Sequence, residues 1–128
     1  MPRSREKPKA ERRVLAEQRG HRGETLAAWL LRAKLYRVIA QRFKTPVGEI
    51  DLVAEQGRTV VFIEVKWRRR GAPEAEALSA VNRKRIVRAA QYWLSRHPEQ
   101  ADRDLRFDVI FLAPGRWPRH LVNAFTAF

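Results

Sequence analysis

The chain has 128 residues, a length typical of a single domain. Hydrophobic residues make up 45% of it and charged residues 32%, which indicates a globular protein rather than a disordered one. Lys and Arg number 27 against 14 Asp and Glu, and the resulting net charge of +13 favours a polyanionic partner, because neutralising phosphates releases condensed counterions. The lack of cysteine excludes disulfides and thiolate metal sites.

Nothing in the sequence indicates a membrane partner or a secretory signal. The longest wholly apolar run, Leu26 to Leu31, is too short to cross a bilayer, and the basic N-terminal segment is followed by no apolar stretch. We therefore expect a cytoplasmic protein that binds nucleic acid and no membrane. The scattered His21, His97 and His120 lack the spacing of a zinc pair and are expected to be ordinary surface or hydrogen-bonded histidines.

The first 20 residues are rich in Lys, Arg, Glu and Pro. We predict that residues 1–20 form a flexible basic arm, with helix from Glu11 onward as one alternative. Such an arm either follows a phosphate backbone or is a solvated tail. Residues 21–128 are expected to form the single folded domain.

Apolar periodicity and the positions of Gly and Pro predict the elements of that domain. A helix with a broad apolar face is predicted first, and a longer one, either continuous or in two pieces around Asn82, follows the third strand. In chain order the predicted elements are a helix over Glu24–Ala33, strands over Tyr36–Phe43, Val47–Ala54 and Thr59–Trp67, a helix over Glu74–Ser95, a strand over Leu105–Ala113 and a short strand near His120–Ala124.

The order αβββαβ(β) predicts an α/β domain with a mixed β-sheet flanked by helices. The third predicted strand contains the nearly continuous apolar run Val60 to Val65, interrupted by Glu64. Such a run is typical of a strand that is covered on both faces of its sheet.

Four charged residues lie on the two strands of the predicted hairpin. Because side chains two apart in a strand point to the same face, Glu49 and Asp51 share a face, and so do Glu64 and Lys66. A salt bridge between Lys66 and either Glu64 or Glu49 explains one carboxylate. It does not explain three acidic groups that converge with one lysine in a strongly basic protein.

The length of the hairpin loop decides which residues face each other. If residues 57–58 form a two-residue loop with glycine first, as in a type II′ turn, Asp51 lies opposite Glu64. If residues 56–57 form the loop, Glu49 lies opposite Glu64. In both registers all four charged groups lie on one side of the sheet, and only an odd-length loop or a bulge would separate them.

Converging carboxylates beside a lysine are suited to the hydrolysis of phosphodiesters. Hard divalent cations such as Mg²⁺ or Mn²⁺ bind carboxylate oxygens, activate water and neutralise charge that develops on phosphate. A lysine two residues beyond a metal-binding carboxylate can contact both the attacking water and the phosphate oxygens.

Asp51 followed by Glu64-Val65-Lys66 resembles the signature of the PD-(D/E)xK nuclease superfamily, whose fold is restriction-endonuclease-like. More specifically, the chain resembles the YraN family (UPF0102) of small uncharacterised bacterial proteins, which is related to Holliday-junction resolvases. The resemblance runs from about residue 20 to residue 128. It rests on Gly23-Glu24, Gly48-Glu49-Ile50-Asp51-Leu52, Val61-Phe62-Ile63-Glu64-Val65-Lys66-Trp67-Arg68, Arg85-Ile86, Ala89-Ala90, Arg106-Phe107-Asp108-Val109 and Asn123-Ala124-Phe125.

The resemblance assigns roles to five residues. It implies that Asp51 and Glu64 are metal ligands and that Lys66 is the catalytic lysine. Glu24 is either a further metal-binding acidic residue or a glutamate favoured by the helix dipole. Glu49 is either a residue that supports the ligands or the counter-ion of Lys66.

The chain also departs from the pattern of this family at three positions. Leu35 stands where a glycine before the tyrosine is common, and Arg42 stands where an asparagine is common. Asn82 stands where a lysine is common, which leaves an auxiliary catalytic role of the later helix open.

Two basic clusters are predicted to bind the nucleic-acid backbone. Such contacts position a substrate without reading its sequence. The alternative is that both clusters are solvated surfaces. They comprise Arg68, Arg69 and Arg70 after the third strand, and Arg83, Lys84, Arg85 and Arg88 on the later helix.

The four tryptophans are interpreted mainly as packing residues. Trp67, next to the first basic cluster, either stacks on a base or packs at the rim of the core. Trp29, Trp93 and Trp117 are assigned to packing.

Three functional hypotheses follow. The first is a Mg²⁺-dependent endonuclease acting on DNA, and the resemblance adds branched or recombination intermediates as substrates and a homodimer as an alternative to a monomer. The second is a non-catalytic nucleic-acid-binding module on a nuclease-like fold. The third is a structural partner protein in which the charges form a buried network. Metal binding separates the first hypothesis from the others, and salt-dependent DNA affinity separates the first two from the third.

Overall fold

The computed structural model describes residues 22–69 and 71–127. The predicted basic arm, its helical alternative, His21 and Arg70 lie outside the described residues. The elements are a first helix, helical over residues 22–33, then β1 (Arg37–Thr45), β2 (Gly48–Gln56), β3 (Thr59–Trp67), α2 (Glu74–Ser79), α3 (Arg83–Arg96), the 3-10 helix η1 (Pro98–Gln100), β4 (Asp104–Leu112) and β5 (Arg119–Phe125).

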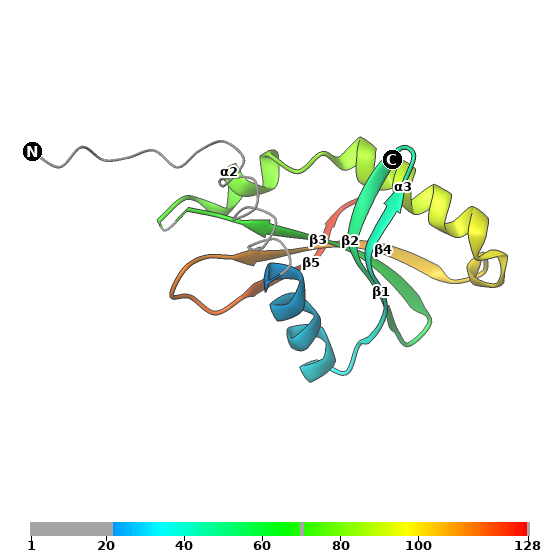
Figure 1. The fold of residues 1–128 in the computed structure, drawn as a ribbon, viewed down its shortest axis with the longest axis horizontal. Coiled ribbons are helices and arrows are strands. Elements are labelled where there is room, and N and C mark those ends of the chain that lie inside the picture. The colour runs from blue at the N-terminus through cyan, green and yellow to red at the C-terminus, as the bar shows by residue number, and fades with distance from the viewer. Residues whose placement is uncertain (1–21, 70, 128) are drawn as a thin grey trace, which may run out of the picture.

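The five strands form one mixed sheet in the order β1-β2-β3-β4-β5. Neighbouring strands are antiparallel except β3 and β4, which are parallel. Parallel neighbours need a crossover connection, and α2 and α3 provide it (Figure 1). The predicted α/β fold, with its mixed sheet and its order of elements, is therefore confirmed.

Helices cover both faces of the sheet, with the first helix on one side and α3 on the other (Figure 1). On β3, Phe62 belongs to the core beneath α3 and meets the ring of Trp93 edge-on. Val61 and Ile63 belong to the second core, beneath the first helix, together with Leu31. The alternation between two cores confirms that β3 is apolar because both of its faces are buried.

The region predicted as one long helix or two pieces contains two helices, α2 and α3. Asn82 separates them, and its side-chain oxygen accepts a hydrogen bond of 3.2 Å from the backbone N–H of Arg85, as an N-cap does. At the other end, His97 caps α3, its Nδ1 lies 2.8 Å from the carbonyl oxygen of Trp93, and its ring stacks on that tryptophan. His97 is thus a hydrogen-bonded histidine, as expected.

The first helix buries a narrower face than the sequence predicts. Ala27, Ala28 and Leu31 are buried against the sheet, whereas Leu26 and Trp29 are exposed, Trp29 to 67%. The packing assignment of Trp29 is wrong, because only the residues spaced three and four apart face the sheet. Among the described residues, no helix has the length and apolar character needed to span a membrane.

The first helix ends in a Schellman motif. The backbone N–H of Tyr36 donates to the carbonyl of Leu31 at 2.9 Å, and that of Leu35 donates to the carbonyl of Arg32 at 3.0 Å. This motif places the residue after the C-cap in the left-handed region, usually a glycine. Here that residue is Leu35, with φ of 68°. Leu35, which stands where a glycine is common in the family, thus occupies a backbone conformation that favours glycine.

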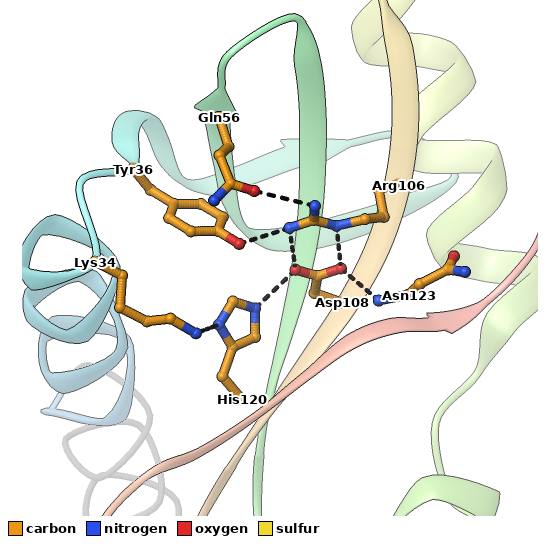
Figure 2. Close-up of polar contacts among 7 residues, drawn as sticks. All are labelled: Lys34, Tyr36, Gln56, Arg106, Asp108, His120 and Asn123. Carbon is orange, nitrogen blue, oxygen red and sulfur yellow. Dashed lines mark hydrogen bonds and ion pairs between the residues drawn. The ribbon is translucent and has the colours of Figure 1, made fainter.

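A buried carboxylate ties β5 to β4 (Figure 2). Asp108 is fully buried, and its two oxygens accept hydrogen bonds of 2.9 Å from Nε and Nη2 of Arg106. His120 and the backbone N–H of Asn123 supply two more, at 2.7 and 2.9 Å. Because Lys34 donates to Nδ1 of His120 at 2.7 Å, Nε2 carries the proton that is donated to Asp108. His120 is therefore a hydrogen-bonded histidine, as expected.

Arg106 extends this cluster to two further segments. Its guanidinium donates to the hydroxyl of Tyr36 at 2.7 Å and to the side-chain oxygen of Gln56 at 3.1 Å (Figure 2). The polar cluster therefore joins the end of the first helix, the β2–β3 hairpin, β4 and β5.

Candidate active site

The β2–β3 hairpin sets the register of the predicted site. Its innermost pair is Gln56 with Thr59, so that residues 57–58 form a two-residue loop, and the glycine of this loop has φ of 59°. That positive φ is the one required at the first position of a type II′ turn. In this register Asp51 lies across from Glu64, which is the first of the two predicted alternatives.

Strands β2 and β3 separate just where the carboxylates begin. Their ladder of paired residues ends at Leu52 and Ile63. Beyond it, Oδ2 of Asp51 accepts a hydrogen bond of 2.8 Å from the backbone N–H of Val65. The carboxylate therefore takes the place of a main-chain acceptor in the ladder, which fixes its position between the strands.

Glu24 joins the carboxylates from the first helix. It lies on the same helical face as Ala27, Ala28 and Leu31, and it is only 7% exposed. One carboxylate oxygen each from Glu24, Glu49 and Asp51 lie within 4.8 Å of one another. The structure therefore brings together the acidic residues that the sequence placed on a helix and on β2.

Arg42 on β1 lies against this cluster. Its Nε is 3.5 Å from Oε2 of Glu24 and 3.6 Å from Oε1 of Glu49. The ion pair of Glu49 with Arg42 favours the first alternative for Glu49, a residue that supports the ligands, over a counter-ion of Lys66. Arg42 has φ of 51°, a left-handed conformation in which asparagine is several-fold enriched. Sequence reasoning noted this departure but missed its place beside the site.

The carboxylates open into a cavity of about 320 Å³ between the sheet and the crossover helices. Arg85 reaches it from α3 and faces the strand residues across it. The lining residues are Glu49, Asp51, Glu64, Lys66, Ala80, Asn82, Arg85 and Ile86.

Gly48 lets α3 approach the start of β2. A Cβ atom on Gly48 would lie 2.8 Å from Cγ and 2.9 Å from the carbonyl oxygen of Arg85. Any side chain there would push α3 away from the cavity. The glycine of the Gly48-Glu49-Ile50-Asp51 segment is thus required by close packing.

Burial and mutual repulsion raise the pKa values of three carboxylates. Burial first, then the charge of Asp51 and a hydrogen bond with it, raise the pKa of Glu64 to about 8, although Lys66 opposes the rise. Burial and the charge of Asp51 raise the pKa of Glu24 to about 7, against the influence of Arg42. Burial also raises the pKa of Asp51, although the hydrogen bond from Val65 opposes it. The set therefore accumulates more negative charge than its protein neighbours neutralise.

The residues present are suited to a hard divalent cation. Carboxylate oxygens are the ligands that Mg²⁺ and Mn²⁺ prefer, and the three oxygens of Glu24, Glu49 and Asp51 lie close enough to share one ion. The raised pKa values fit the same reading, because a bound cation favours the ionised carboxylates. Glu64 adds a fourth carboxylate next to Asp51.

The predicted basic residues differ in their relation to this cavity. Arg85 lines it, and Arg68 and Arg69 line an adjoining hollow that also includes Lys66. Arg83, Lys84 and Arg88 are exposed on α3, and the guanidinium of Arg83 lies 5.6 Å from the ring centre of Phe125. These three are therefore not among the residues that line the cavity.

Two tryptophan assignments are tested directly. Trp93 is buried in the core, as expected. Trp117 is 93% exposed in the loop between β4 and β5, so its assignment to packing is wrong. No pattern in the sequence marks it as exposed except its place between Gly115 and Pro118. Trp67 packs against the core beneath the first helix, which favours the second of its two alternatives.

Comparison with known proteins identifies relatives along almost the whole chain. The profile of the family described as "Uncharacterised protein family UPF0102" matches residues 23–112. A UPF0102 protein of Parvibaculum lavamentivorans is 50% identical over 123 residues, which cover 96% of this chain and 92% of the relative. A UPF0102 protein of Chelativorans sp. is 49% identical over 90% of this chain and 93% of its own length. A UPF0102 protein of Rhodopseudomonas palustris strain BisA53 is also 49% identical, over 94% of this chain and 92% of its own length.

Proposed function

The chain belongs to the uncharacterised protein family UPF0102, and we propose that it is a metal-dependent endonuclease that hydrolyses phosphodiester bonds in nucleic acid, with DNA as the substrate. One observation carries this proposal. Three carboxylates from β2 and β3 line a cavity together with Lys66 and Arg85, and a carboxylate oxygen of Glu24 on the first helix lies within 4.8 Å of oxygens of two of them, Glu49 and Asp51.

The carboxylates alone would repel a phosphate. Keeping four of them together in a chain of net charge +13 makes chemical sense if a cation binds between them. A divalent cation held there would neutralise charge on the phosphate and activate a water molecule. Asp51 and Glu64 are the proposed central ligands, and Glu24 and Glu49 are the proposed additional ones.

Lys66 and Arg85 are the residues proposed to act on the phosphate itself. Both line the cavity, Lys66 from β3 and Arg85 from α3 across from it. Hydrolysis adds the oxygen of water to phosphorus and breaks the bond to the leaving alcohol, whose oxygen takes up a proton. The ammonium of Lys66 would orient the water and stabilise the growing negative charge, and Arg85 would hold the phosphate from the opposite wall.

The raised pKa values of the carboxylates support the proposed cation. Without it, burial and repulsion favour the protonated form of Glu64 even near pH 7. Binding a cation must therefore release protons, and its affinity should rise with pH up to about 8.

Calorimetric titration with Mn²⁺ and a cleavage assay on labelled branched and linear DNA test this proposal. The protein should bind the metal and cut DNA only when it is present. Asp51→Ala/Glu64→Ala should lose both properties, and Glu99→Gln, which changes an exposed carboxylate of η1, should lose neither.

Two results would contradict the proposal in different ways. Absence of metal uptake, even with DNA bound, would exclude the nuclease and leave a nucleic-acid-binding module. Metal uptake that survives the double substitution would place the metal elsewhere in the protein.

A further inference from the structure

Trp117 is the most exposed of the large apolar side chains in the described part of the chain, at 93%. It lies in the loop between β4 and β5, next to Arg116 and Pro118. An exposed indole offers a flat face on which another planar group can stack. The core does not need this side chain, so the question is what it is exposed to.

The surroundings of Trp117 are concave and basic. A hollow of about 580 Å³ borders it, and all the charged residues that line this hollow are arginines. One of them, Arg119, forms an ion pair with Glu74 of α2. The lining residues are Arg68, Pro114, Gly115, Arg116, Trp117 and Arg119.

Shared lining residues relate this hollow to the candidate active site. Lys66 and Ala80 line both the carboxylate cavity and a second, smaller hollow. Arg68 lines both that second hollow and the one beside Trp117. Three neighbouring hollows, which together form the depression considered below, therefore follow one another from the carboxylates, past Lys66 and Arg68, to Trp117.

The sheet topology explains this arrangement. Because β3 and β4 are parallel, their carboxyl ends reach the same edge of the sheet, where the N–H of Arg68 donates to the carbonyl of Leu112 at 2.7 Å. The β4–β5 loop follows directly after Leu112. Arg68 lies two residues beyond Lys66, about 7 Å along an extended chain. The distance is short enough for one nucleic-acid strand to contact both regions.

We propose that this depression binds an unpaired segment of nucleic acid, with a base stacked on Trp117 and its flanking phosphates bound by Arg68, Arg116 and Arg119. The stacking partner must be unpaired, because in a duplex each base face is already covered by its neighbours. Aromatic stacking combined with a positively charged groove is the general means by which proteins hold single strands.

This inference rests on the proposed function in one respect: the bound strand is the one whose phosphodiester lies at the carboxylates. The substrate would then be DNA with a single-stranded stretch next to the scissile bond, such as a flap, a fork or a strand end. A continuous duplex would leave Trp117 without a partner.

Fluorescence anisotropy in EDTA tests the binding without any cleavage. The full-length protein is titrated into a labelled single strand and into a duplex of the same sequence, at one fixed salt concentration. The variants are Trp117→Ala, Trp117→Phe and Trp29→Ala, the last as a matched control because Trp29 is a second exposed tryptophan, on the first helix.

Trp117→Ala should weaken single-strand binding on the order of 5- to 150-fold, the range found for the loss of one base–aromatic stack. Trp117→Phe should restore most of the affinity, and Trp29→Ala should change it less than about twofold. Affinity for the duplex should fall much less than affinity for the single strand. Circular dichroism of each variant shows that it is folded.

Several outcomes would overturn the inference. Equal affinity of wild type and Trp117→Ala for the single strand would do so, as would an equal loss on single strand and duplex. The inference would also be overturned if wild type, but not Trp117→Ala, bound vesicles of phosphatidylcholine and phosphatidylglycerol while both proteins bound DNA equally. Because the assay contains no metal, a failure of the nuclease proposal would leave these results unaffected, and the converse also holds.

Discussion

Replacing Glu64 by glutamine should stabilise the metal-free protein at pH 8.5 and change its stability much less at pH 5. In the folded protein, burial and Asp51 raise the pKa of Glu64 from 4.5 to about 8. The unfolded chain keeps the ordinary value. Glutamine resembles the protonated carboxyl in shape and carries no charge to bury.

The size of the effect follows from this pKa difference. Below pH 4.5 Glu64 is protonated in both states and does not make stability depend on pH. Between pH 4.5 and about 8 the unfolded state loses its proton while the folded state keeps it, so the free energy of unfolding falls as pH rises. The full difference corresponds to about 5 kcal/mol, and about 3–5 kcal/mol is expected because Asp51 shares the charge.

Urea unfolding in EDTA at pH 5 and pH 8.5 measures this effect. Wild type should lose several kcal/mol between the two pH values, and Glu64→Gln should lose markedly less. The control Glu99→Gln, at an exposed position, should follow wild type. If Glu64→Gln were less stable than wild type at pH 8.5, or differed from it equally at both pH values, the account of the buried carboxylates would be wrong.

Three further substitutions test the fold that supports the site. Leu35→Gly should raise the free energy of unfolding by about 1 kcal/mol and the melting temperature by roughly 3–5 °C. The reason is that Leu35 has φ of 68° and is 90% exposed, so its side chain adds strain without packing. A lower melting temperature in calorimetry would refute this. Gly48→Ala should destabilise by about 1–3 kcal/mol and weaken Mn²⁺ binding, because the new Cβ meets the backbone of Arg85 at 2.9 Å; unchanged urea unfolding would show that α3 can yield. Asp108→Asn should destabilise by about 3 kcal/mol, because it leaves Arg106 without its charged partner inside the cluster of Figure 2. Burial alone would raise the pKa of Asp108, but the hydrogen bonds from His120, Arg106 and Asn123 lower it overall. Wild type should therefore lose its greater stability over Asp108→Asn only as pH falls through and below the ordinary pKa of 3.8. A variant as stable as wild type at pH 7 would contradict the reasoning.

The sequence limits the register of the hairpin to two alternatives, because strand periodicity and the position of the glycine restrict the loop. Strand periodicity places Glu49, Asp51, Glu64 and Lys66 on one face, and glycine at the first position of a two-residue loop favours the register in which Asp51 faces Glu64. The structure adopts that register. The separation of the strands beyond Leu52 could not be predicted, because it depends on contacts of each strand with its other neighbour.

The surroundings of the carboxylates depend on tertiary contacts that leave little local signal. Glu24 shares a helical face with Ala27 and Leu31, so its direction is predictable once the buried face is known. The breadth of that face was overestimated, as the exposed Trp29 shows. The left-handed backbone of Arg42 has no sequence signal, since only glycine, asparagine and aspartate adopt it readily.

The exposure of Trp117 also depends on tertiary structure and could not be predicted from the sequence. A tryptophan is assigned to packing by its size, and only the arrangement of β3, β4 and β5 shows that no core lies next to this loop. The parallel pairing of β3 and β4, which joins the loop to the site, is a topological property rather than a local one.

In the proposed reaction, Lys66 acts on a phosphodiester beside a metal held by the carboxylates. The most direct measurement is the rate of cleavage of an end-labelled DNA flap in Mg²⁺ by wild type and by Lys66→Met, with Mn²⁺ affinity determined calorimetrically for both. Wild type should cut the flap only with metal, and Lys66→Met should bind the metal at least as tightly but cut at least about 100-fold more slowly. Equal cleavage rates, or no metal-dependent product from wild type, would refute this role of Lys66.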